Sequence, residues 1–318
     1  MFNFFSSVIR MVLGYETTSM KTTILATCGL ALLAAVTIGA GPAAAATCPT
    51  TVFPNLSNKP GAGAGYVKPS VTVTCSTTRL KVSSNGMPSY TFVAKTPSAL
   101  RAQKWSWSVP LSPKVAVSTT SIDGRLGTIG FTTTGLPFYG PEEGDQPADE
   151  AHGDPIFNGL LDSCYGHNGP MGDYHIHALR WTIGCGFTTQ KIVAYAADGF
   201  PVYAGQACLN KKCTSTATLQ SGYVRTGNPK KNAWDAYTYR SGGTTTLDRC
   251  NGRTEPDGSY GYHITKGFPY IIGCFRGTPV TQSGAAAARM PAMKVGVSVP
   301  LVPRAFCDLT RLLRSRTL

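Results

Sequence analysis

Two segments of the chain repeat the same order of cysteine, glycine and histidine signals, and this repetition restricts the fold more than any other feature. The segments are "LDSCYGHNGPMGDYHIHALRWTIGC" at 161–185 and "LDRCNGRTEPDGSYGYHITKGFPYIIGC" at 247–274. Both contain L-D-x-C, a glycine-containing turn, Y-H-I and I-G-C. A shorter element, G-apolar-P-apolar-Y, precedes each segment, at 135–140 and 199–205. Similarity of this extent predicts two copies of one structural unit.

The predicted fold is mainly β: a disulfide-stabilised, β-rich domain with an internal duplication, preceded by a small β module. The two repeats are expected at about 129–185 and 192–274. Glycine and proline are abundant, threonine, valine and tyrosine are common, and long amphipathic helical stretches are scarce. These preferences favour short strands joined by loops over helices.

The cysteines predict a disulfide framework, because an exported chain folds in an oxidising compartment. Proximity in sequence suggests four pairs and leaves Cys307 over; the pairs are Cys48–Cys75, Cys164–Cys185, Cys208–Cys213 and Cys250–Cys274. Sequence alone leaves the connectivity open. One pair brackets the Y-H-I strand of each repeat. Closing such a loop is expected to stabilise the fold by on the order of 3 kcal/mol.

The chain divides into four parts. Residues 1–46 contain an apolar run that ends in the cleavage-like "PAAAA" and are expected to be a signal peptide, with 1–19 a start-site overcall; a retained membrane helix is the alternative. Residues 47–118 alternate apolar and polar residues, with an "NG" turn signal and an edge strand at "WSWSVPL", and predict a small β module. The domain that contains the two repeats occupies 119–277. The low-complexity basic tail at 278–318 is expected to be disordered.

All five histidines lie in the repeated region, and two of them suggest a metal site. His175 and His177 stand at i and i+2, so on a strand both side chains project from one face. Aligning the two Y-H-I triplets pairs His263 with His175 and puts Thr265 opposite His177. The predicted ligands are therefore His175 and His177, with His167 and His263 as helpers and His152 as a further candidate. Imidazole ligands favour copper or zinc.

The acidic run "EEGDQPADEAHGD" at 142–154 adds carboxylates that can ligate a metal or orient a histidine ring. Two alternatives to simple metal binding stay open. One is a metal-dependent extracellular hydrolase or oxidase, with Asp173 or Asp198 as its base. The other is a cell-surface binding module whose histidines are structural. The sequence has neither a G-x-S-x-G elbow nor an H-E-x-x-H helix to identify a known hydrolase.

Charge and hydropathy exclude other partners. The chain has a net charge of +13, but 5 of these units lie in the tail after Gly277, and no basic stripe with interleaved aromatic residues is present. Nucleic acid is therefore not expected as a partner. After the expected signal peptide no stretch is long and apolar enough to span a bilayer. The expected partner is a metal ion, and contact with the membrane is expected only through the signal peptide.

Four motifs, in order, resemble the YHYH domain family of exported, mainly bacterial proteins. They are "GHNGPMGDYHIH", "YAADGFPVYA", "LDRCNGRTEPDGSYGYHIT" and "FPYIIGCFRG", and the resemblance covers roughly residues 119–277. In this chain the family's Y-H-Y-H is Y-H-I-H, with Ile176 at the second aromatic position and both histidines kept. The resemblance implies an exported location but no particular activity.

Overall fold

The computed structural model describes residues 47–144, 152–187 and 191–281, which belong to one compact unit of the chain. The expected signal peptide, Cys307 and the tail from residue 282 lie outside these residues. The described part contains short strands and no α-helix; its 3-10 turns are η1 (Thr50–Val52), η3 (Ile183–Cys185) and η4 (Trp234–Ala236). The predicted mainly β class is confirmed. No helix of this part has the length and apolar character needed to cross a membrane.

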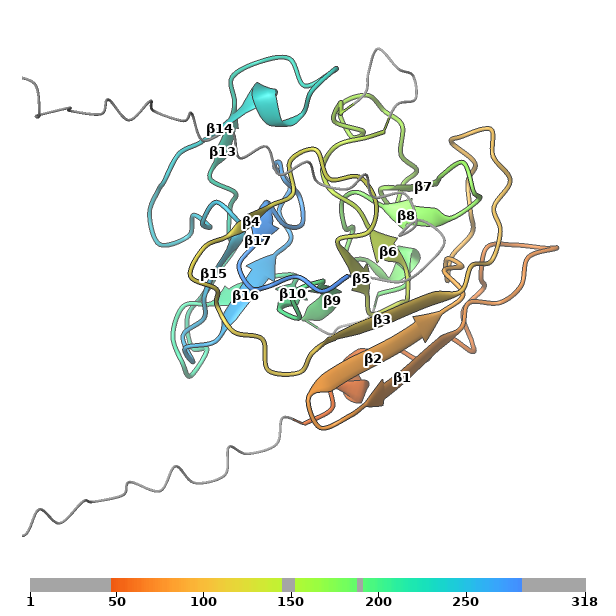
Figure 1. The fold of residues 1–318 in the computed structure, drawn as a ribbon, viewed down its shortest axis with the longest axis horizontal. Coiled ribbons are helices and arrows are strands. Elements are labelled where there is room, and N and C mark those ends of the chain that lie inside the picture. Colours follow the sequence, from red (N-terminus) through yellow and green to blue (C-terminus); the bar gives the residue numbers. More distant parts are fainter. Residues whose placement is uncertain (1–46, 145–151, 188–190, 282–318) are drawn as a thin grey trace, which may run out of the picture. The chain divides into compact units, whose positions relative to one another are not determined.

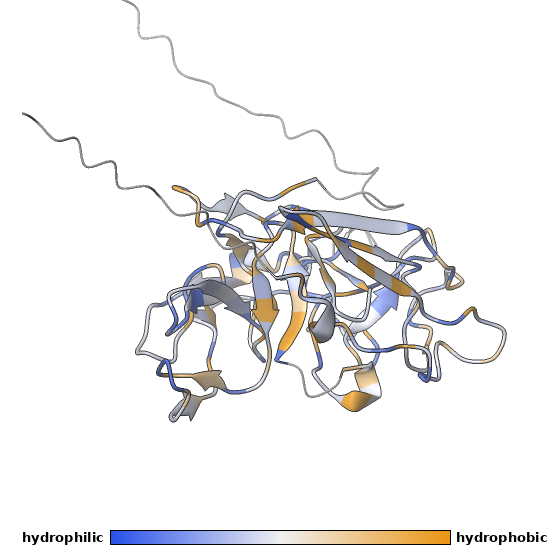
Figure 2. Cartoon of the chain, turned by 90° about the horizontal axis from the view of Figure 1, so that it is seen from below, coloured by the Kyte–Doolittle hydropathy of each residue, from blue (hydrophilic) through white to orange (hydrophobic). Residues whose placement is uncertain are grey.

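A three-stranded antiparallel sheet comes first in the described chain. Its order is β1 (Val71–Cys75), β2 (Arg79–Ser84) and β3 (Trp105–Pro110), so the predicted edge strand is present as β3. Alternate residues of β2 and β3 are buried, because successive side chains on a strand point to opposite faces. Figure 2 shows apolar residues interleaved with polar ones on the strands.

The hairpin of this sheet turns at a different place from the predicted one. β1 and β2 are joined at residues 76–78, where the Ser76 N–H donates to the Arg79 carbonyl. The predicted turn signal, Asn85 and Gly86, instead follows β2. The Asn85 side chain accepts a hydrogen bond from the N–H of Ser70, and Gly86 has a φ of +64°. Together they turn the chain away from the sheet, as glycine at positive φ allows.

An eight-stranded mixed sheet forms the centre of the described part (Figure 1). In spatial order its strands are β15 (Gly252–Thr254), β16 (Tyr260–His263), β10 (Pro201–Tyr203), β9 (Ile192–Ala196), β5 (Gly130–Thr132), β6 (Pro137–Phe138), β8 (Tyr174–Ile176) and β7 (Gly166–Asn168). We call β5, β6, β8 and β7 the first half-sheet, and β9, β10, β16 and β15 the second half-sheet.

The two half-sheets have the same internal arrangement. In each, an outer hairpin is antiparallel, as in β7–β8 and β15–β16, and its inner strand runs parallel to the next strand, as in β6–β8 and β10–β16. The halves meet at the antiparallel pair β5–β9, where Phe131 is opposite Tyr195. The strands that carry the Y-H motifs are β8 and β16. Four strands, β10, β9, β5 and β6, lie between them in the sheet.

Aromatic residues join the two sheets. Trp107 of β3 stacks on Phe131 of β5 with ring centroids 4.9 Å apart, and Phe131 stacks on Tyr195 of β9. These rings, with Leu80, Val82 and other buried residues, form a core separate from the larger one, which contains Phe138, Tyr174 and Tyr262. The first sheet thus covers the central strand pair of the second.

The remaining strands form two-stranded pairs. These are β11 (Ala207–Cys208) with β12 (Thr216–Ala217), β13 (Tyr223–Arg225) with β14 (Tyr237–Tyr239), and β4 (Thr120–Ser121) with β17 (Cys274–Phe275). All four predicted disulfides are present, namely Cys48–Cys75, Cys164–Cys185, Cys208–Cys213 and Cys250–Cys274. A disulfide therefore closes the Y-H hairpin of each half-sheet.

Candidate metal centre

The β7–β8 hairpin brings three histidines together. His167 on β7 is directly opposite His175 on β8, and His177 follows two residues later on the same face. The three ring centroids lie 4.7 to 5.1 Å apart. Each side chain is no more than 5% exposed. The predicted i, i+2 geometry is thus realised on a strand in the protein interior.

A turn built around Asp162 sets the register of this hairpin. Its Oδ1 accepts hydrogen bonds from the N–H groups of Cys164 and Gly166, and its Oδ2 accepts one from the Tyr174 hydroxyl at 2.6 Å. The Tyr165 carbonyl accepts the N–H of His177. A Cβ at Gly166 would lie 2.4 Å from the Tyr174 hydroxyl oxygen, so only glycine fits beneath that ring. Asp162 thus organises a turn beside the Cys164–Cys185 disulfide.

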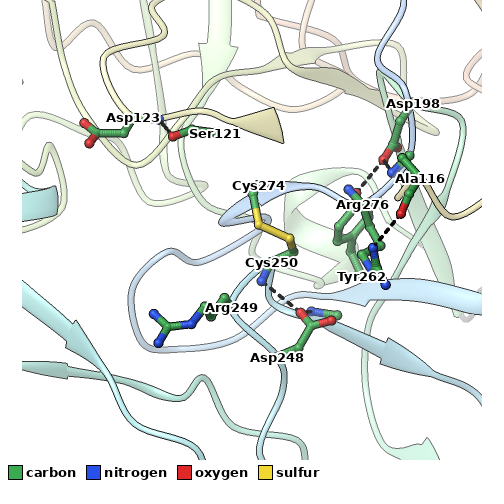
Figure 3. The surroundings of a disulfide bond; sticks show 12 residues. Ala116, Ser121, Asp123, Asp198, Asp248, Arg249, Cys250, Tyr262, Cys274 and Arg276 are labelled. Carbon is green, nitrogen blue, oxygen red and sulfur yellow. Dashed lines mark hydrogen bonds between the residues drawn. A yellow bond between two sulfur atoms is a disulfide. The ribbon is translucent and has the colours of Figure 1, made fainter. Parts of the chain in front are cut away.

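The second half-sheet contains the same turn. Asp248 Oδ1 accepts from the N–H groups of Cys250 and Gly252, and its Oδ2 accepts from the Tyr260 hydroxyl. Figure 3 shows Asp248 beside Cys250 and the disulfide to Cys274. Tyr260 therefore corresponds to Tyr174.

This register corrects the alignment made from sequence. Since Tyr260 corresponds to Tyr174, Gly261 corresponds to His175, and His263 corresponds to His177. The N–H of His263 donates to Asn251, just as that of His177 donates to Tyr165. The sequence pairing of His263 with His175 was wrong. The triplet at 262–264 has the same letters, Y-H-I, as the motif at 174–176, but the turn at Asp248 pairs Tyr174 with Tyr260, two residues before Tyr262.

Glu143 completes the cluster from the segment that follows β6. Its Oε2 lies 2.9 Å from Nε2 of His167 and 3.5 Å from Nε2 of His177. The two Nε2 atoms are 3.3 Å apart. One ligand atom from each of Glu143, His167, His175 and His177 lies within 4.8 Å of the others. This cluster can hold a metal ion.

Hydrogen bonds on the outer side of the cluster orient two of the rings. Nδ1 of His177 is 2.7 Å from the Gly140 carbonyl, and Nδ1 of His175 is 3.2 Å from the Asp173 carbonyl. A carbonyl can only accept, so each Nδ1 carries the proton and each Nε2 is left with a lone pair. Nε2 of His175 is buried without a hydrogen-bond partner. Buried polar atoms without partners are uncommon, and a bound cation would satisfy this nitrogen.

Tyr139 and Asp173 support His175 from behind. The Tyr139 ring stacks on the His175 ring with centroids 3.9 Å apart and planes 13° apart. The Tyr139 hydroxyl donates to Oδ2 of Asp173, 3.1 Å away. The His175 ring is therefore fixed by stacking as well as by its hydrogen bond. Such secondary contacts are typical of histidines that ligate metals.

Burial favours the neutral forms of His175 and His177, and contact with the histidines favours the ionised form of Glu143. Burial lowers the pKa of His177 to about 4 and that of His175 well below its usual range, and the other histidines add to both shifts. Burial alone would raise the pKa of Glu143, but its contacts with His167 and His177 lower it. Neutral imidazoles and an ionised carboxylate are the ligating forms.

The other two candidate ligands lie outside the cluster. Nε2 of His263 is 2.6 Å from Oε1 of Glu255, in the second half-sheet, and His152 is paired with Glu142 at 3.1 Å. At about 4.8 Å per strand, the five steps from β8 to β16 place His263 roughly 24 Å away across the sheet.

Of the two candidate bases, only Asp173 lies beside the cluster of histidines. Asp198 instead accepts a hydrogen bond from the Tyr262 hydroxyl at 2.5 Å (Figure 3), and it also accepts one from the N–H of Gly277. Glu143 was not singled out from sequence, although it lies in the acidic run noted there. Its signal was position: it follows the G-apolar-P-apolar-Y element, which the fold places beside β8.

A family model described as YHYH protein matches residues 106–277, which is more than half of the chain. The chain belongs to the YHYH protein family. The match begins inside β3, so it includes the strand whose Trp107 stacks on Phe131. No curated protein and no solved structure matches the chain. Membership of the YHYH family and the four disulfides are consistent with an extracellular location.

Proposed function

We propose that this YHYH protein is exported and binds one transition-metal ion, copper or zinc, through Glu143, His167, His175 and His177. The observation that carries the proposal is the convergence of four ligand atoms, three of them on buried histidines, within 4.8 Å. Three imidazole nitrogens and one carboxylate oxygen form a donor set that suits both metals, whereas calcium and magnesium prefer oxygen ligands.

The proposed role of the ion is structural. It would connect the segment after β6 to the β7–β8 hairpin, two parts of the chain that the Cys164–Cys185 disulfide does not join to each other. The histidines are almost fully buried, and Glu143 is 17% exposed. A closed, four-ligand site is typical of structural metals, whereas catalytic metals keep an open ligand position.

Metal analysis of protein purified without a histidine tag tests this function. We expect about one equivalent of metal in the native protein, or after titration of the apoprotein, because the ligands are already assembled. The double variant His175→Ala/His177→Ala is expected to bind none, while His263→Ala serves as the matched control and keeps the metal. Less than about 0.1 equivalent in the native protein, with none taken up on titration, would contradict the proposal.

An extracellular metal-dependent hydrolase or oxidase is the second candidate function. The observation that favours it is Asp173, a carboxylate beside His175 whose pKa is raised by burial. Such an enzyme needs a ligand position open to water. A change in the absorption spectrum of bound Co²⁺ on adding azide would reveal that position. We expect an unchanged spectrum, because all four ligands of the closed site come from the protein.

We also propose that the domain at 119–277 arose by internal duplication, with residues 47–118 as a covering module. The matching half-sheets and the two Asp-centred turns support the duplication. The Trp107–Phe131 stack supports the covering role. His177 and His263 occupy equivalent positions, so the difference between the two halves lies in the residues around these histidines. The proposed metal site therefore belongs to the first half alone.

A further inference from the structure

A pocket of about 200 Å³ lies in the second half-sheet at the position that corresponds to the metal cluster. It has room for roughly seven water molecules, at about 30 Å³ each. His263 and Tyr203, which correspond to His177 and Tyr139, both line it. In the first half-sheet the histidines at this position are almost fully buried, whereas the second half-sheet has a pocket there.

Two replacements explain why this site lacks the metal cluster. Arg253 stands where the first half has His167, and Gly261 stands where it has His175. A Cβ at Gly261 would lie 2.3 Å from the Tyr203 ring, so the glycine allows that ring to occupy the space over the strand. The site therefore keeps one imidazole and gains an aromatic wall.

A guanidinium supplies the positive charge that a metal would supply in the first half. Arg253 donates to both carboxylate oxygens of Glu255, at 3.0 and 2.6 Å, and Glu255 Oε1 also contacts His263. Bidentate pairing of this kind fixes both side chains. Glu255 is thus already neutralised and has no charge left for a ligand cation.

The remaining charges of the pocket favour an anion. Lys191, Lys211 and Asp257 line it, so two ammonium groups face one carboxylate. Asp257 accepts hydrogen bonds from Ser259 and is attracted by Lys211. The Lys191 ammonium lies 4.0 Å from the Cys208 sulfur rather than in an ion pair with a carboxylate of the described residues. It is the cation that a ligand carboxylate can reach.

We propose that this pocket binds a small hydroxylated carboxylate the size of one uronic acid, independently of metal. Lys191 would bind the carboxylate, Asp257 and Gln206 the hydroxyl groups, and the Tyr203 ring the apolar face of the sugar. An aromatic wall beside polar side chains suits a ligand with apolar and hydroxylated faces.

Calorimetric titration of the full mature chain with D-glucuronate and with D-glucose tests the proposal. Glucuronate should bind at least about ten times more tightly than glucose, because only glucuronate pairs with Lys191. Lys191→Ala should weaken glucuronate binding by at least about tenfold. The exposed Lys231→Ala variant is the matched control and should change nothing.

Equal affinity for the two sugars, no binding of either, or an unaffected Lys191→Ala variant would each overturn the proposal. The titration is repeated on His175→Ala/His177→Ala, whose metal content is measured separately. Glucuronate binding should survive in this variant, since its site contains neither residue. Loss of the metal site alone therefore leaves this inference standing, and loss of sugar binding alone leaves the metal proposal standing.

Discussion

The first and second half-sheets share one backbone plan but carry different chemistry. Both have an Asp-centred turn, a tyrosine bound to that aspartate, a disulfide, and a histidine at the equivalent position, His177 or His263. The first half adds His167, His175 and Glu143 and forms a closed cluster. The second has Arg253 and Gly261 and leaves a pocket. A few side chains on a common framework thus decide between a cluster that can hold a metal ion and an open pocket.

The largest expected difference between the halves is their response to metal. Wild-type protein in excess zinc or copper should be stabilised by about 4 kcal/mol when the free ion exceeds its Kd a thousandfold. His175→Ala/His177→Ala should lose this gain, whereas His263→Ala should keep it. Thermal unfolding with and without a chelator measures the effect. If all three proteins respond alike, the two halves do not differ in metal binding.

Removing a disulfide should affect both halves about equally. Cys164→Ser/Cys185→Ser and Cys250→Ser/Cys274→Ser open loops of similar sequence separation, 21 and 24 residues. Each change should lower the free energy of unfolding by on the order of 3 kcal/mol. Denaturant titrations in the presence of chelator compare the two variants. A difference well above about 1 kcal/mol would show that the frameworks are not equivalent.

Replacing the turn aspartates should affect stability similarly but metal affinity differently. Asp162→Ala and Asp248→Ala each leave two backbone N–H groups and a tyrosine hydroxyl without their acceptor, at a cost of about 2 kcal/mol. Only Asp162→Ala should also weaken metal binding, because its turn sets the register of His167 against His175. Calorimetric titration with zinc checks this; equal zinc affinities in the two variants would contradict it.

The smallest expected effect concerns the support behind His175. Tyr139→Phe keeps the stacked ring and removes only the hydroxyl that donates to Asp173. We expect a loss of about 1 kcal/mol in stability and little change in metal stoichiometry. Tyr203→Phe is the counterpart in the second half and should leave metal binding unchanged. Loss of bound metal in Tyr139→Phe would place the hydroxyl among the groups on which the site depends.

Local signals in the sequence were enough to predict much of this arrangement. Cysteine proximity gave the four disulfides, and the alternation of β2 and β3 gave the first sheet. The i, i+2 spacing put His175 and His177 on one face, and His167 within the same cysteine loop was named as their helper. All of these contacts lie within about 30 residues of sequence, where spacing limits geometry strongly.

Contacts that depend on strand order could not be predicted in this way. The central pairing of β5 with β9 puts the two Y-H strands far apart, so His263 cannot contact His175. Glu143 reaches His167 only because β6 runs parallel to β8. The register of the second repeat was misread because Tyr262 resembles the motif tyrosine, whereas a hydrogen bond identifies Tyr260 as the equivalent residue. Hydrogen bonds of the turn, rather than the motif letters, determine which residues correspond.

Anomalous X-ray diffraction from crystals of untagged protein, recorded at the zinc and copper edges, would locate the bound metal. We expect one strong peak among Glu143, His167, His175 and His177, with nitrogen and oxygen ligands at about 2.0–2.2 Å. We expect no peak beside His263 and Glu255, where Arg253 supplies the positive charge. A peak at the second position, or none at the first in crystals soaked with metal, would contradict the proposed metal site.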